Sequence, residues 1–377
     1  MKSFLHRIKG AVALTLAMTM FCPQVFAAEE VAAIPALTVE EALTKAIKHD
    51  PELKNIEDSL ELLAENQDDI DEAFGSVSLP NYDFERWTDQ WLFDLYNGVY
   101  QIEQGMKQAK LGRSLQKLIL ETTVKTYFTT IISIEDGLEL ARESAAMQQK
   151  AYEQGYVKYR LGMLSKYNLE QLQLTAQKAK NSVITTEAAL EQVYITFNDL
   201  IGEEPEKRFD FVYGVTFAPY EMTKTLDQYI RDEMKEDIMI QMQELTADAA
   251  KFKANYRPLS NVSEASIESD ELALKKAERT LKTAKSDKET LMRNTYLQIK
   301  ALETDYASAE LDLKKAQADY RVAQLSHQTG AVTKTAVEGA AMGVAAAENA
   351  LKALVYKHDM LVYQFENPSV LFGTTTQ

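Results

Sequence analysis

Apolar residues recur at alternating steps of three and four over two long stretches of the chain, and each stretch turns at a glycine and then continues. In the first copy the stripe comprises Leu120, Val124, Tyr127, Ile131, Ile134, Leu138, Ala141 and Ala145 before Gly162, and Leu169, Leu172, Ala176, Ala179 and Val183 after it. In the second it comprises Ile299, Leu302, Tyr306, Ala309, Leu313, Ala316, Tyr320 and Ala323 before Gly330, and Val337, Ala340, Val344, Ala347, Leu351 and Leu354 after it. This spacing keeps one stripe of a helix against a partner helix, as in a coiled coil. The pattern predicts an all-α chain built from two long antiparallel helical hairpins.

Capping residues, prolines and glycines divide the rest of the chain. Thr38 and Glu41 have the spacing of a capping box, and Pro51 predicts a break in the helix that they begin. The expected helices span about 38–50, 52–74, 84–159, 165–200, 225–255, 269–328 and 333–365. Aromatic residues near 209–217 predict at most a short strand or extended strap. The two hairpins suggest a duplication, with a first repeat at 29–202, a linker at 203–224, a second repeat at 225–366 and a tail at 367–377.

The first 28 residues have the pattern of a Sec-type signal peptide. Lys2, Arg7 and Lys9 precede an apolar run, and small residues follow at Ala27 and Ala28. We therefore expect export to the cell envelope, in a periplasmic or outer-membrane-associated position. The single cysteine, Cys22, lies inside this leader, so thiol chemistry is not expected after cleavage.

Charge and residue spacing exclude several classes of function. Removing the three basic residues of the leader lowers Lys plus Arg from 41 to 38 against 57 Asp plus Glu, a balance of about −19, which argues against nucleic acid as a partner. The sequence contains no phosphate-binding glycine loop, nucleophile elbow or zinc spacing, so we expect no catalytic residue, no cofactor and no metal. His358 falls on the apolar stripe and is interpreted as a packed core histidine rather than a ligand. No apolar stretch after the leader is long enough for a transmembrane helix.

Several short segments can be compared with known families: residues 37–43 (LTVEEAL), 50–53 (DPEL), 159–165 (YRLGMLS) with Leu169 and Leu172, 200–202 (LIG) and, more loosely, 328–333 (QTGAVT). Together they resemble the TolC family of outer-membrane efflux proteins. The resemblance implies a homotrimer whose helices form a tunnel. It also implies that the Gly162 and Gly330 turns face the inner membrane, where they would dock a membrane-fusion adaptor coupled to an inner-membrane pump.

The chain departs from this family at the first loop of each repeat, where TolC-like proteins insert a β-hairpin that contributes to a membrane barrel. A membrane strand needs about 9–11 residues. Only nine residues separate Phe74 from Phe84, and thirteen separate Asn255 from Ser269. We therefore expect the chain to lack these hairpins and to stay peripheral to the membrane unless another protein supplies a pore.

Two groups of residues are candidates for contacts with other molecules. Trp87 and Trp91 follow the first shortened loop and either touch a membrane surface or partner there or simply cover the helical core. The two turns are either adaptor-docking tips or ordinary glycine turns that any helical hairpin needs. The tip residues are Tyr159, Arg160, Leu161, Gly162, Met163, Leu164 and Ser165 in the first turn, and Gln328, Thr329, Gly330, Ala331, Val332 and Thr333 in the second.

The sequence thus favours a TolC-like export component that forms a passive helical tunnel and is not an enzyme. The alternative is a structural coiled-coil protein of the cell envelope that has kept the hairpins but lost the barrel and conduction. A trimer with a water-filled lumen would support the tunnel, and a monomer or closed bundle would support the structural coiled-coil protein.

Overall fold

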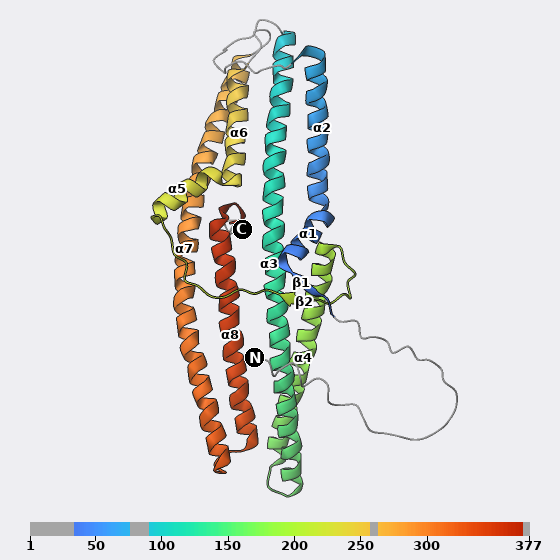
Figure 1. Cartoon of the computed structure of the whole chain (residues 1–377), viewed down its shortest axis with the longest axis vertical. Helices are drawn as coiled ribbons and strands as arrows, with labels where there is room; N and C mark the ends of the chain where they lie inside the picture. The colour runs from blue at the N-terminus through green and yellow to red at the C-terminus, as the bar shows by residue number, and fades with distance from the viewer. Residues whose placement is uncertain (1–33, 76–89, 257–262, 372–377) are drawn as a thin grey trace, which may run out of the picture. The chain divides into compact units, whose positions relative to one another are not determined.

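The computed structural model describes residues 34–75, 90–256 and 263–371. Its elements in chain order are β1 (Ala36–Thr38), α1 (Val39–His49), α2 (Pro51–Phe74), α3 (Gln90–Arg160), α4 (Lys166–Ile201), β2 (Asp210–Val212), α5 (Leu226–Glu236), α6 (Ile238–Asn255), α7 (Glu264–Gln328), α8 (Lys334–Glu366) and a 3₁₀ turn (Pro368–Val370). Figure 1 shows α3 and α7 as the two longest helices of this part of the chain. The predicted all-α fold of long helical hairpins is confirmed.

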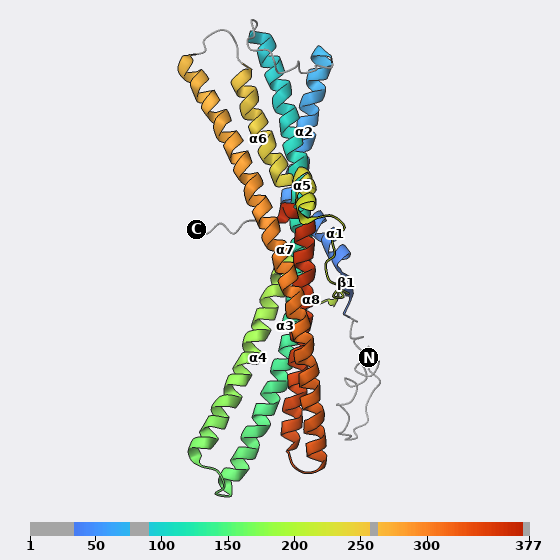
Figure 2. The same cartoon turned by 90° about the vertical axis from the view of Figure 1, so that its left-hand side faces the viewer.

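Four helices lie in a row in the order α4, α3, α8, α7 (Figure 1). Figure 2 shows that the α3–α4 and α7–α8 pairs cross near the middle of this row. The hairpin α3–α4 and the hairpin α7–α8 each pack along their own seam, and α3 joins the two by packing on α8. Lys352 pairs with Asp136 at 2.5 Å, and Lys150 lies 3.6 Å from Glu338, so polar contacts fix this central junction. At the end away from the glycine turns, α2 packs on α3 and α6 packs on α7.

Aspartates begin both α2 and α6. Thr38 and Glu41 form the predicted capping box of α1. The chain then breaks at Asp50, whose carboxylate accepts the backbone N–H of Leu53 at 2.7 Å and begins α2.

The single helix expected at 225–255 is wrong. The chain breaks at Asp237, whose carboxylate accepts the N–H of Ile240 at 2.9 Å and begins α6. No proline marks this break, so the sequence pattern predicted one continuous helix across it. The Asp237 cap begins α6 in the same way that Asp50 and Pro51 together begin α2.

The extended segment expected near 209–217 contains β2, and its partner was not foreseen. β2 pairs in parallel with β1, with Leu37 opposite Phe211. The ring of Phe211 meets that of Phe128 edge-on, with centroids 4.7 Å apart. The small sheet therefore fastens the start of the described chain and the linker to the middle of α3.

Burial is deepest where a third element covers a hairpin. Val124, Phe128 and Ile131 of α3 are fully buried, together with Phe197 of α4. A second core surrounds Ile299, Met292 and Phe365. Toward the glycine turns only two helices meet, and the seam alanines Ala145 and Ala323 are half-buried. The predicted stripes do face the partner helices, but they are buried more deeply in the middle of the helices than near the turns.

Some expectations fall outside the described residues. These are the leader at 1–28, Trp87, the helix start near Phe84, the first shortened loop after Gly75, and residues 257–262 of the second. The rest of the second loop is described, and α7 begins there at Glu264, five residues before the expected start at Ser269. Among the helices that the structure describes, none combines the length and the apolar character needed to cross a membrane.

Candidate docking tips

The two glycine turns have the same backbone geometry. Gly162 and Gly330 adopt left-handed conformations, with φ of 73° and 76°. In the first turn, Met163 donates its N–H to the carbonyl of Lys158 at 2.8 Å and Gly162 donates to Tyr159 at 2.9 Å. This pair of bonds is the Schellman motif, which satisfies the last carbonyls of a helix and needs a residue that tolerates positive φ.

The second turn repeats these bonds at equivalent positions. Ala331 donates to the carbonyl of Ser326 at 2.8 Å, and Gly330 donates to His327 at 2.9 Å. Three residues after each glycine a hydroxyl begins the returning helix: Ser165 accepts the N–H of Asn168 at 3.2 Å and Thr333 accepts that of Ala336 at 3.3 Å. The two turns are therefore one structural unit that occurs twice.

Side chains make the two tips different. At the first tip, Leu161 is 69% exposed and Met163 is 72% exposed, and Tyr159 nearby is 39% exposed. At the second tip the glycine is followed by Ala331 and the half-buried Val332, whose carbonyl lies 2.9 Å from His327 Nδ1. Large exposed apolar side chains next to a turn are unusual on a surface that only meets water.

Charge also separates the tips. The first turn carries Lys158, Arg160 and Lys166 on exposed positions, although the whole chain has a formal charge of −16. Each tip has one lysine beside a glutamate, Lys166 at 3.7 Å from Glu170 and Lys334 at 4.0 Å from Glu338, so Lys158 and Arg160 make the difference in charge. The first tip is thus a basic, apolar spot on an acidic protein.

The structure brings both predicted tips to the same end of the helical row (Figure 1). The contact between Lys150 and Glu338 joins α3 to α8 before the turns are reached, and Figure 2 shows the two hairpins separating from there toward their turns. Most of the thirteen predicted tip residues are exposed there, and Leu164 and Val332 are half-buried. Leu164 and Leu172 close over Gly155, where an added Cβ would lie 2.4 Å from Leu172 Cδ1.

Trp91 lies at the opposite end of α3. It is 56% exposed, and its ring meets that of Phe74 edge-on with centroids 5.7 Å apart. Both interpretations of this tryptophan stay open as predictions, because it covers Phe74 on one side and is exposed on the other.

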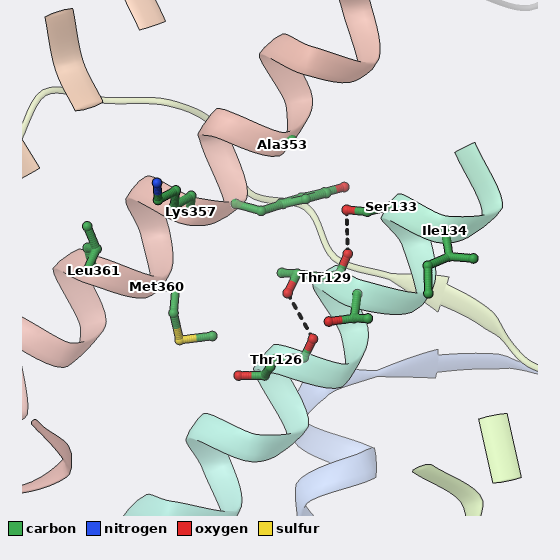
Figure 3. Close-up of a pocket in the computed structure, with 10 residues that line it drawn as sticks. Thr126, Thr129, Ser133, Ile134, Ala353, Lys357, Met360 and Leu361 are labelled. Atoms are coloured by element: carbon green, nitrogen blue, oxygen red, sulfur yellow. Dashed lines mark hydrogen bonds between the residues drawn. The ribbon is translucent and has the colours of Figure 1, made fainter. Parts of the chain in front are cut away.

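A cavity of about 440 Å³ opens between α3 and α8. Figure 3 shows hydroxyl-bearing residues on the α3 side and Met360 and Leu361 on the α8 side. Ser133 donates to the carbonyl of Thr129 and Thr129 to that of Thr126, so these hydroxyls are satisfied by their own helix. The cavity offers a mixed hydroxyl and apolar surface with no nucleophile held beside a base.

The segment between β2 and α5 is held by contacts with α7 that the sequence did not predict. Glu303 of α7 accepts hydrogen bonds from Lys300 Nζ and from the backbone N–H of Tyr220, both at 2.9 Å. Burial raises the pKa of the Glu303 carboxyl, but these donors outweigh burial and leave its pKa below the usual value. The ring of Phe217 stacks on Tyr306 at 3.7 Å between centroids.

His358 belongs to the same group and is 5% exposed, as expected of a core histidine. Its Nε2 lies 3.7 Å from the Glu303 carboxylate, and its ring packs on Phe217. Within the part of the chain that the structure describes, no three or more His, Cys, Asp or Glu side chains are placed to hold a metal ion.

Known proteins match this chain in structure but not in sequence. No family model matches the chain, and no curated protein matches it. The CmeC outer membrane channel of Campylobacter jejuni matches with a TM-score of 0.69 over 97% of this chain and 96% of that one, at 11% identity. The outer membrane protein VceC of Vibrio cholerae matches with a TM-score of 0.58 over 87% and 95%, at 12% identity.

This chain has the fold of the TolC-like outer-membrane efflux channels. The MtrE outer membrane channel of Neisseria gonorrhoeae extends the likeness, with a TM-score of 0.53 over 94% of this chain and 98% of that one, at 12% identity. CmeC and MtrE are both outer membrane channels. At these identities the likeness establishes the TolC-like fold alone.

Proposed function

We propose that this chain is a TolC-like export component in which copies of the helical row close around a passive tunnel in the cell envelope. Three copies form the tunnel, as the resemblance implies, and cargo passes through without covalent chemistry. Selectivity then comes from the charge and width of the lining.

The observation that carries the proposal is the pair of equivalent tips at one end of a row of long helices. A row of four helices with both turns at one end is a segment of a wall, and its tips form a rim. Leu161 and Met163 on that rim are more exposed than folding alone requires. The rim is therefore the surface that docks a membrane-fusion adaptor, which couples the tunnel to an inner-membrane pump.

The assembly is tested by the mass and shape of the leader-free chain in solution, by light scattering together with small-angle X-ray scattering. The expected result is a particle of three chains with a hollow profile. A monomer at all concentrations would overturn the tunnel and favour a structural coiled-coil protein of the envelope.

Docking is tested separately with the double variant Leu161→Asp, Met163→Asp. We expect it to keep the mass of the unchanged protein and to lose cross-linking to the adaptor in cells. Leu62→Asp is the matched control, because Leu62 is 58% exposed on α2, away from the tips. Equal cross-linking of all three proteins would overturn docking at the first tip.

A further inference from the structure

The cavity between α3 and α8 lies on the face of the helical row opposite to the one that carries α1 and the small sheet. On α3, Phe128 packs on the sheet, and Thr126 and Thr130 lie two residues before and after it. Two residues turn a helix by about 200°, so both threonines lie on the opposite side. On α8 the same holds for Lys357, two residues before Asp359, which bonds to the segment that follows β2. We call this opposite side the cavity face.

The cavity is open on this face and closed behind. Tyr356 contributes to its back wall, since it is only 8% exposed and its ring packs on that of Tyr213 with centroids 5.5 Å apart. Figure 3 shows Met360 extending from α8 toward α3, with Lys357 one turn away on the same helix. The volume of about 440 Å³ falls in the range of about 300–1,000 Å³ that is typical of small-molecule sites. The cavity therefore has room for one small organic molecule.

Charge is nearly absent from the cavity face, although 26% of the residues of the chain are charged. At coiled-coil spacing, the α3 side of this face comprises Leu115, Ile119, Thr122, Thr126, Thr129, Ser133, Gly137, Leu140 and Ser144. The α8 side comprises Gly339, Gly343, Ala346, Ala350, Ala353, Lys357, Met360 and Gln364. Lys357 is the only charged residue in the two lines. An anion that the acidic protein repels elsewhere meets a single positive charge here.

Two polar groups at the cavity are available to a ligand. Lys357 is exposed, and among the described residues it has no carboxylate partner. Three hydroxyls of the α3 wall donate to carbonyls of their own helix, whereas that of Thr130 has no such bond within the described part of the chain. Met360 and Leu361 add apolar surface beside them. One cation and one hydroxyl next to apolar side chains suit a ligand with one negative charge and an apolar body.

We propose that the α3–α8 cavity binds amphipathic monoanions, with a carboxylate or similar group at Lys357 and Thr130 and the apolar body on Met360 and Leu361. A cation would be repelled by Lys357, and a dianion would find only one positive charge. The site lies within one chain, so binding does not require a second copy.

The position of the cavity gives this site a role in the proposed tunnel. The face with α1 and the small sheet has to point outward, because these elements would fill a narrow lumen. The cavity face then points inward, along the path of the cargo. This role rests on the proposed function, and it makes amphipathic monoanions the class of cargo that the wall retains.

Binding is tested by isothermal titration calorimetry of the purified chain with octanoate, octanol and octylammonium, which share one alkyl chain and differ in charge. We expect octanoate to bind most tightly, octanol more weakly and octylammonium least, because Lys357 attracts the first and repels the third. Equal affinities for the three probes, or no binding of octanoate, would overturn the inference.

A variant of the lysine separates its charge from the rest of the cavity. Lys357→Met should weaken octanoate binding by about tenfold or more, as expected for the loss of a hydrogen bond to a charged group, and should leave octanol binding nearly unchanged. Lys314→Met is the matched control, because Lys314 is an exposed lysine of α7 outside the cavity. If the two variants bind octanoate equally, Lys357 does not hold the anion and the inference is wrong.

A second variant tests the cavity itself. Ala353 is exposed and lines the cavity, so Ala353→Trp should fill it without disturbing the helix. The variant should lose binding of both octanoate and octanol while its circular dichroism stays the same. Octanoate binding at the original affinity would place the anion elsewhere and overturn the site.

Light scattering on the same samples distinguishes this inference from the proposed function. If the chain is monomeric but binds octanoate through Lys357, the site stands and the tunnel is wrong. If the chain forms a hollow trimer and octanoate does not bind, the tunnel stands and the site is wrong.

Discussion

Lys288 Nζ lies 3.2 Å from Asp237 Oδ2 in a fully enclosed ion pair, with side-chain exposures of 8% and 0%. Lys288 also donates to the backbone carbonyls of Pro368 at 2.7 Å and Leu371 at 3.2 Å. Asp237 is the residue that begins α6. One lysine on α7 therefore joins the break between α5 and α6 to the end of the described chain.

Lys288→Met should be strongly destabilising because it leaves the Asp237 carboxylate buried without its cation. Breaking such a pair costs about 3–5 kcal/mol in the free energy of unfolding. The double variant Lys288→Met, Asp237→Asn should recover part of this loss, since Asn can still cap Ile240. Urea unfolding followed by circular dichroism measures both, and equal stability of the two variants would contradict the explanation.

Gly202→Ala should cost more than Gly162→Ala. Both glycines have positive φ, of 69° and 73°, where a side chain costs about 1–2 kcal/mol. An added Cβ at Gly202 would also lie 2.7 Å from His49 Nδ1, whereas nothing lies within 4 Å of one at Gly162. Thermal unfolding of the two variants gives the difference. Adding His49→Ala to Gly202→Ala should remove most of that difference, and no change would show that the contact is not the cause.

Acid should loosen the linker through Glu303. Its pKa in the folded chain lies below its ordinary value of 4.5, so its stabilising effect is complete above that value and is lost as pH falls through the lower folded pKa. The protection factors of the amides of residues 213–222, which correct for the intrinsic pH dependence of exchange, should therefore fall on acidification below about pH 4.5. Glu303→Gln removes this titration, so its protection factors should be lower at neutral pH and less dependent on pH. Parallel pH profiles for the two proteins would argue against Glu303.

Phe128→Ala should test the attachment of the small sheet to α3. Phe128 is fully buried and touches the rings of Phe197, Phe211 and Tyr213. Removing a buried aromatic ring costs about 3–5 kcal/mol. Phe128→Leu should cost less, and Leu62→Ala on the exposed face of α2 should change stability by about 0.5 kcal/mol or less. Urea unfolding of the three variants checks the order.

The apolar stripes were enough to predict both hairpins, because a coiled-coil seam repeats over many turns and each repeat supports the next. The turns at Gly162 and Gly330 could also be predicted, because they depend on nearby residues alone. A Schellman motif needs a residue that tolerates positive φ, and the next helix needs a hydroxyl to begin it. The capping box at Thr38 is equally local.

Contacts between distant segments could not be predicted in this way. The pairing of β1 with β2 joins segments about 170 residues apart through three-residue strands, which are too short to show a pattern. The break at Asp237 depends on a buried lysine from α7. The hydrogen bonds to Glu303 involve the segment between β2 and α5, whose sequence has no periodicity that would predict them.

The sequence by itself therefore determined the helical hairpins, their turns and the tip residues, because these follow from heptad spacing and local hydrogen bonds. The tertiary structure decided which faces of those helices are used inside the chain and which stay exposed. A single sequence does not show which faces of α3 and α8 meet α1 and the segment after β2 and which line the cavity between them. That distinction depends on which helices become neighbours, and only the packing of the whole row establishes it.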